Sequence, residues 1–427
     1  MTTAEATPPA VAWQLPEIRA VAAAIAGTSA GAMPAFLTGA IAVQLIDEIG
    51  LDARTLGFCL GGYFTTAAAG SAVLGRLAER VGPVVAMRLA VGLALTVSLL
   101  LATLTRSTAT LGGLLLVGGL SNAFAQPSAN LLLVERVRPE RHGFAFALKQ
   151  AGMPVASLVG GLLVPTIALT VGWRWTYVVA AGIAAAALLI LGRSPAVTPL
   201  RRSGPGEEGH DRPDVGVEAV DGPVDDGPRK PDLPLSLLLL YALVGLLAAS
   251  TAGALMTFLV ASAEAVGLAE GPAGLVLAGG SAVGVVSRLI HGRLADGPRL
   301  LPIRRVALLL AIGAVGVAGF AIHQPWAYVS FVFLAFGAGW SWPGLFQLSV
   351  VRNNPSAPAA ATGISQTGIY VGAALGPVVG GVIADAYGFR ALWLVGAGAL
   401  LTASALATVL RVRLRAHRVA AAAATPT

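Results

Sequence analysis

Apolar runs that are long enough to cross a lipid bilayer make up most of this chain of 427 residues. A run of roughly 17–25 apolar residues spans a hydrocarbon layer about 30 Å thick as a helix. Helices are expected because lipid leaves backbone groups without partners and the runs show no strand-like alternation. Composition agrees, with 56% hydrophobic and 11% charged residues, which excludes an ordinary soluble protein. Twelve spans are predicted, at about 20–45, 55–76, 83–105, 109–134, 143–170, 174–193, 235–262, 270–292, 303–323, 326–350, 359–384 and 389–411.

The second half of the chain repeats the first half in the same order. Gln150-Ala151-Gly152 is echoed by Gln366-Thr367-Gly368, and Gly172-Trp173-Arg174 by Gly388-Phe389-Arg390, at one constant separation. The duplication predicts an all-α membrane protein with twelve transmembrane helices in two parallel-repeat bundles of six. The expected divisions are an N-terminal half at 1–193, a linker at 194–233 and a C-terminal half with a basic tail at 234–427.

The linker and the basic residues predict the orientation. Residues 194–232 are rich in Gly, Pro and charged residues, which predicts a disordered cytoplasmic segment. His210 and the pair Asp225-Asp226 could suggest a metal site, but a solvated linker is the preferred interpretation, so no metal is expected. With both termini cytoplasmic, most of the 28 lysines and arginines fall in the inside loops and tails, as the positive-inside rule requires. We therefore expect a multi-pass protein of the cytoplasmic membrane. The outer loops keep only Arg54, Arg106, Arg174 and Arg390.

A short loop motif, repeated in both halves, resembles that of the major facilitator superfamily. Gly75-Arg76-Leu77-Ala78-Glu79 follows the second span, and Gly292-Arg293-Leu294-Ala295-Asp296 follows the eighth. The resemblance implies the fold of that family, secondary transport, and a gate at the cytoplasmic side. By resemblance the gate residues are Gly75, Leu77, Glu79, Arg80, Gly82, Gly292, Leu294 and Asp296. The sequence departs from the family in having Glu79 where aspartate is usual and Pro83-Val84 where basic residues follow. Without the resemblance, these residues form a short solvated loop.

A glycine-proline run in the eleventh span resembles the motif of proton-coupled drug antiporters. It reads Gly368, Gly372, Gly376, Pro377, Gly380 and Gly381. In those antiporters the motif lies in the fifth helix, whereas the fifth span here has only Gly160, Gly161 and Pro165. Drug efflux is therefore the second choice of function.

Polar side chains gather in the first, fourth, seventh and tenth spans. Since buried amides and hydroxyls are costly in lipid, they are expected to face one shared wet cavity. The candidate substrate-binding residues are Asn122, Gln126, Asn130, Lys149, Gln150, Tyr241, Arg288, Trp340, Trp342 and Gln366.

Lys149 is the most informative of these candidates. It follows His142 by seven residues, which places it about 10 Å into the membrane at 1.5 Å per residue. Its stem could snorkel to the interface, but we favour a cavity lysine that contacts an anion, because a charge inside the membrane usually has a partner or a task. The run Lys-Gln-Ala-Gly-x-Pro loosely resembles bacterial carriers of small anions such as cyanate.

Arg288 lies four residues before Gly292, near the inner end of the eighth span. Locally the sequence resembles monocarboxylate transporters, in which a similarly placed arginine binds the carboxylate. An interfacial anchor, or a gate partner for Asp296, is the alternative role. Both interpretations stay open.

The carboxylates do not identify a coupling ion, because no predicted span has one at its centre. Asp47 and Glu48, at the outer end of the first span, and Lys149 itself are the candidate proton acceptors. A coupling proton is left open.

The sequence lacks the residue patterns that other classes of function need. Gly27-Thr28-Ser29-Ala30-Gly31 matches the G-x-S-x-G motif of hydrolases, but it lies inside a predicted span, so no enzyme is expected. Neither lysine, Lys149 or Lys230, stands in a phosphate-binding loop, so ATP is not expected. The scattered basic residues argue against nucleic acid. We expect a monomeric secondary transporter in the lipid bilayer with a small-molecule substrate and no cofactor. A small organic anion is the first choice, amphipathic drugs the second, and a non-transporting membrane sensor the third.

Overall fold

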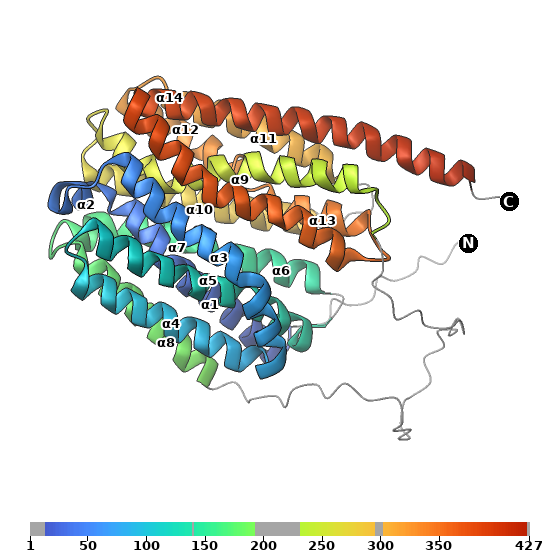
Figure 1. The fold of residues 1–427 in the computed structure, drawn as a ribbon, viewed down its shortest axis with the longest axis horizontal. Coiled ribbons are helices and arrows are strands. Elements are labelled where there is room, and N and C mark those ends of the chain that lie inside the picture. Colours follow the sequence, from blue (N-terminus) through green and yellow to red (C-terminus); the bar gives the residue numbers. More distant parts are fainter. Residues whose placement is uncertain (1–12, 139–140, 193–230, 295–301, 425–427) are drawn as a thin grey trace, which may run out of the picture.

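The structure is a computed structural model, and it describes residues 13–138, 141–192, 231–294 and 302–424. These residues are almost entirely helical and contain no strand. The two halves lie side by side with their long helices roughly parallel (Figure 1). The prediction of an all-α protein is confirmed.

The N-terminal half contains the first six predicted spans. Helix α3 ends at Val81, five residues past the predicted span, because polar residues at its solvated end remain helical. The predicted span at 20–45 is interrupted near Ile41, between α1 and the short α2. The elements are α1 (Leu15–Ala40), α2 (Ala42–Ile49), α3 (Ala53–Val81), α4 (Pro83–Leu104), α5 (Thr108–Arg136), α6 (His142–Gln150), α7 (Gly152–Leu163), the π-helix η2 (Val164–Ala168) and α8 (Arg174–Gly192).

The C-terminal half contains the other six spans. Helix α14 includes the last two, which meet at Gly388, where φ is 79° and favours glycine. Helices α12 and α13 together cover the tenth span. The elements are α9 (Leu235–Glu264), α10 (Glu270–Leu294), α11 (Pro302–Phe320), α12 (Pro325–Gly337), α13 (Pro343–Arg352) and α14 (Pro358–Ala424).

Ten helical stretches in the described residues are long and apolar enough to cross a membrane. One of them belongs to α14, which has a predicted span on each side of Gly388, and the pair α12–α13 supplies the remaining span. Each of the twelve predicted spans therefore coincides with one or more helices.

We call the end of the bundle where α8 stops and α9 starts the linker end, and the opposite end, where α2 lies, the far end (Figure 1). The halves touch mainly through α3 with α14 and α7 with α10. At the far end, Arg54 Nη2 lies 3.0 Å from Asp385 Oδ2, and Gln44 donates a hydrogen bond to Glu270. A Cβ on Gly161 would lie 2.5 Å from the Gly274 carbonyl oxygen, so these helices pack backbone to backbone. The two halves are therefore closely joined at the far end.

Most of the predicted linker at 194–233 falls outside the described residues, as does the candidate metal pair in it. The described residues that precede α9 are bound to the loop before α14. Ser356 donates to both carboxylate oxygens of Asp232, from its N–H at 3.0 Å and its hydroxyl at 2.7 Å. The N–H of Leu233 donates to Asn354 Oδ1 at 3.0 Å. The start of the C-terminal half is thus attached within its own half.

Candidate functional site

A break in the fifth span fixes the position of Lys149. Helix α6 ends at Gln150 and α7 begins at Gly152. Helix α1 lies directly against this break: Ser29 Oγ donates to the Gly152 carbonyl at 2.9 Å, and a side chain at Gly152 would collide with Thr28. The close approach of α1 therefore requires glycine at position 152. Because α6 ends at Gln150, Lys149 is the penultimate residue of that helix.

Lys149 points into the bundle. Its side chain is 4% exposed, and Nζ donates to Gln126 Oε1 of α5 at 2.5 Å. Gln126 Nε2 in turn donates to Asn122 Oδ1, one turn away, at 3.3 Å. The ammonium ends at a neutral amide near the middle of the long helix α5. Asn130, one turn further toward the linker end, is exposed.

Arg288 of α10 joins the two halves at the same level. Its Nη1 donates to the Gln150 carbonyl at 2.5 Å, and its Nη2 and Nε donate to the Trp340 carbonyl at 2.7 and 3.2 Å. The guanidinium carbon also lies 4.9 Å from the centroid of the Trp340 ring. Since Gln150 follows Lys149, two buried cations, one from each half, flank the same backbone segment.

Neither cation has a carboxylate partner in the part of the chain that the structure describes. The ion pairs found there join Arg54 with Asp385, Arg138 and Arg141 with Glu17, and Arg174 with Glu48. Arg288 is 8% exposed. Among the described residues, the site therefore has buried positive charge without a carboxylate that compensates it.

The tenth span is broken beside Arg288. Helix α12 ends at Gly337 and α13 begins at Pro343, and Trp340 and Trp342 lie in the connection. The Trp340 ring lies 6.1 Å from the ring of Phe36 in α1, so Trp340 reaches the other half. Trp342 is buried, and its Nε1 has no acceptor among the described residues. This indole N–H is a spare donor in the connection.

Two further predicted site residues, Tyr241 and Gln366, make polar contacts inside the C-terminal half. The Tyr241 hydroxyl lies 2.6 Å from Ser349 Oγ, and Gln347 donates to Gln366. Hydrogen bonds of the described residues thus connect Asn122, Gln126 and Lys149, and connect Arg288 to the carbonyls of Gln150 and Trp340, whereas the bonds of Tyr241 and Gln366 lie inside the C-terminal half.

The predicted gate residues lie at the linker end. Gly82, with φ of 84°, makes the tight connection between α3 and α4. Gly75 packs against Pro127, whereas Leu77, Glu79 and Arg80 are exposed. In the second copy, Gly292 is half-buried and Leu294 exposed, and Asp296 lies outside the described residues.

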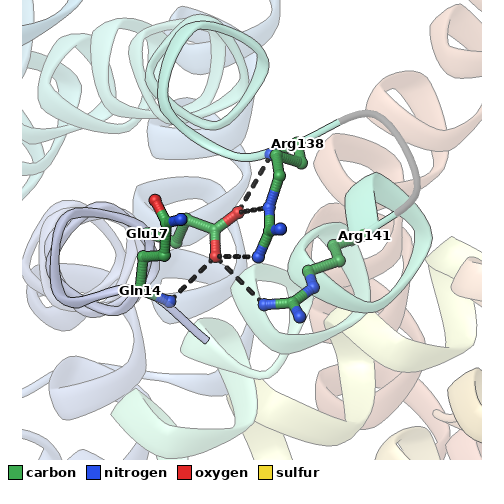
Figure 2. Close-up of polar contacts among 4 residues, drawn as sticks. All are labelled: Gln14, Glu17, Arg138 and Arg141. Carbon is green, nitrogen blue, oxygen red and sulfur yellow. Dashed lines mark hydrogen bonds and ion pairs between the residues drawn. The ribbon is translucent and has the colours of Figure 1, made fainter. Parts of the chain in front are cut away.

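A buried carboxylate that the sequence interpretation missed positions the start of α6. Glu17 of α1 is 3% exposed and accepts from Arg138 Nε at 2.9 Å and from Arg141 Nη1 at 3.0 Å (Figure 2). The N–H of Gln14 also donates to Glu17 at 3.0 Å. Glu17 thus connects α1 to the segment between α5 and α6. No sequence signal marks it, because one acid before an apolar run resembles any solvated end.

The Glu48 carboxylate at the far end is already bound by two donors. Glu48 accepts from Trp173 Nε1 and from Arg174 Nη1, each at 2.5 Å. Two donors hold the pKa of the Glu48 carboxyl below its ordinary value. The hydrogen bond from the Trp173 indole has the larger effect, and the Arg174 guanidinium has the smaller one. Glu48 therefore stays ionised near neutral pH, which argues against it as a proton acceptor.

The hydrolase-like motif has no catalytic geometry. Residues 27–31 lie inside the continuous helix α1, and Ser29 is bound to the Gly152 carbonyl. A nucleophile elbow needs a sharp turn between a strand and a helix. Within the described ranges, no three His, Cys, Asp or Glu side chains are placed to hold a metal ion.

The comparisons with known proteins agree with this geometry. The profile of the Major Facilitator Superfamily matches residues 20–352 and 241–426. Among solved structures, the chain is similar to a bacterial homolog of the human lysosomal transporter Spinster, in its inward-facing and unoccupied conformation. The identity is 15%, with a TM-score of 0.69, over 95% of this chain and 98% of that chain. The inward-facing and occupied conformation gives 15% identity and a TM-score of 0.67 over the same shares. No curated protein matches the chain.

The family profile covers nearly the whole chain, and the helices repeat in two halves around a site to which both halves contribute. The protein therefore belongs to the major facilitator superfamily of membrane transporters.

Proposed function

We propose that the protein moves a small organic anion across the cytoplasmic membrane by alternating access. The observation that carries this proposal is the pair Lys149 and Arg288. Both are buried, they come from different halves, and neither has a carboxylate partner in the described residues. A charge near the centre of a membrane helix costs about 2.5–3.5 kcal/mol on insertion scales. An anionic substrate supplies the missing partner.

Two features support access from the linker end. The halves are joined at the far end by the ion pair Arg54–Asp385 and by the packing of Gly161 on Gly274. On α5, Asn122 and Gln126 are buried, whereas Asn130 on the same face is exposed. An exposed amide facing lipid is costly, so a water-filled path from the linker end to Lys149 accounts for this gradient. The distribution of arginines supports a cytoplasmic linker end, with both termini on that side.

The test is thermal unfolding of the purified protein with a panel of solutes. Pyruvate, malonate and nitrate represent anions, glucose a neutral metabolite, and tetraphenylphosphonium a lipophilic cation. A ligand that binds only the folded state at about 100 times its Kd adds about 2.7 kcal/mol of stability. We expect a rise in melting temperature with one class of anion, and a smaller rise in Lys149→Gln, where Arg288 alone still attracts the anion. The matched control is Lys230→Gln, which changes the other lysine and should keep the shift.

Other outcomes would favour the other functions. A shift only with tetraphenylphosphonium, unchanged in Lys149→Gln, would reject the anion carrier in favour of drug efflux. Uptake into sealed liposomes without ATP separates a carrier from a membrane sensor, which would bind a solute and not move it. Size-exclusion chromatography with light scattering tests the expected monomer.

A further inference from the structure

The two buried cations differ in how the protein satisfies them. Arg288 donates three hydrogen bonds to two carbonyl oxygens and lies against the Trp340 ring. These partners suit a guanidinium, which stays charged in proteins. Within the described residues, Lys149 donates one hydrogen bond, to the Gln126 amide oxygen, although an ammonium has three N–H groups. A neutral amine can make the same single bond.

No opposite charge compensates Lys149 in the described part of the structure. Helix α6 packs against α1, α5, α7 and α10. The nearest carboxylate along α5 is Glu135, nine residues from Gln126, or about 13 Å at 1.5 Å per residue. Helix α7 has no charged residue. The titratable and charged groups on α6 and these neighbours are His142 on α6, Glu17 and Arg19 on α1, Glu135 and Arg136 on α5, and Glu270, Arg288, His291 and Arg293 on α10.

A second positive charge in the same buried site as Arg288 is unfavourable without an anion, because burial and the neighbouring charge both oppose the ammonium form. We propose that Lys149 is the proton-binding group of the transport cycle: it is neutral in the empty site and takes up one proton when a monovalent anion binds. This inference rests on the proposed function and extends it to the coupling mechanism and to the charge of the substrate.

The charges of the two states balance. The empty site has the single positive charge of Arg288. The loaded site has Arg288, the protonated Lys149 and one monoanion, so its net charge is again one. The proton comes from water on the side where the anion binds and leaves with the anion on the other side. The net charge of the site is thus the same when the loaded protein and the empty protein change conformation. The cycle is therefore an electroneutral symport of a proton with a monoanion.

Proton uptake on binding can be measured directly by titration calorimetry in two buffers that differ in ionisation enthalpy. The probe is pyruvate, or the panel anion that stabilises the protein most, between about pH 6 and pH 9.5. Binding and protonation are linked reciprocally, so the wild type should take up about one proton per anion within this range. The affinity of the wild type for the anion should fall about tenfold per pH unit at pH values where Lys149 of the empty site is neutral.

Lys149→Arg is the diagnostic variant, because an arginine keeps its charge. It should bind the anion with about zero proton uptake and with an affinity that does not depend on pH. If Lys149→Arg does not fold, Lys149→Gln replaces it, since an amide cannot titrate and Arg288 still attracts the anion. In liposomes, an inward proton gradient should drive uptake by the wild type and not by Lys149→Arg.

The outcomes separate the two proposals. Anion binding without proton uptake at any pH in the range, or proton uptake that persists in the variants, overturns the role of Lys149 and leaves the anion carrier standing. Absence of binding by every anion in the panel overturns the proposed function, and this inference with it.

Discussion

Arg288 Nη1, in the C-terminal half, donates a hydrogen bond of 2.5 Å to the carbonyl of Gln150 in the N-terminal half. The acceptor is the last residue of α6, where the helix stops and its carbonyls lack their usual partners. The bond therefore joins the halves at the level of the candidate site. Rocking of the halves about that site would have to change this contact, and a bound anion would compete for the same guanidinium.

Arg288→Lys should weaken anion binding by at least about tenfold, because a lysine lacks the planar fork that binds a carboxylate and a carbonyl together. The measurement is the anion-dependent rise in melting temperature over a concentration series. Arg304→Lys is the matched control, since Arg304 lies exposed on α11. Equal affinities in the wild type and Arg288→Lys would remove Arg288 from the site and leave it as a connection between the halves.

The helices could be predicted from the sequence because length and hydrophobicity determine which segments cross a membrane. The repetition of Gln150-Ala151-Gly152 as Gln366-Thr367-Gly368 also indicated the two halves. The breaks at Ala151 and between α12 and α13 were missed, since they depend on contacts with other helices. The hydrogen bond from Ser29 to the Gly152 carbonyl is one such contact, and it cannot be predicted from hydropathy.

The candidate site could be predicted only in part. Lys149 and Arg288 stand out in the sequence because charges are rare within apolar runs. Their neighbours were harder to assign: Tyr241 and Gln366 have suitable polarity but bind Ser349 and Gln347 instead. Polarity shows that a side chain needs a partner, and only the packing of the helices shows which one.

Glu17→Gln should lower the melting temperature and weaken the attachment of α6 to α1. The change leaves Arg138 and Arg141 without the carboxylate that both of them contact (Figure 2). Truncating one partner of a buried pair is destabilising because it leaves charge uncompensated. Glu79→Gln is the control, since Glu79 is exposed and makes no ion pair within the described ranges. Melting temperatures that fall equally in both variants would contradict this role for Glu17.

Glu48→Gln should have an effect that depends on pH. Trp173 and Arg174 lower the pKa of Glu48 from its ordinary value of 4.5, so the folded state favours the carboxylate. The ion pair therefore contributes stability above pH 4.5, and this contribution is lost as the pH falls through the lower pKa of the folded state. Since both side chains are more than a third exposed, the contribution should stay under about 1 kcal/mol.

The measurement is the difference in melting temperature between the wild type and Glu48→Gln across a pH series. It should be constant from about pH 8 to pH 5 and shrink at lower pH, as the linkage of proton binding to folding requires. A difference that instead grew as the pH fell would show that Glu48 is protonated in the folded state, and it would return Glu48 to the candidates for proton coupling.

The glycines of α14 distinguish helix packing from a drug-antiporter motif. A side chain on Gly368, Gly372 or Gly376 would collide with the backbone of α9, at Ala242, Leu246 and Ser250 respectively. Gly372→Ala should therefore destabilise the protein by about 1–3 kcal/mol through overpacking. Gly398→Ala is the matched control in the same helix, because nothing lies within 4 Å of its added Cβ. There the better helix propensity of alanine should leave stability equal or higher. Gly372→Ala could instead keep the wild-type melting temperature and abolish proton-driven transport. That result would show that packing on α9 is not the role of these glycines, and it would favour the drug-antiporter interpretation of the motif.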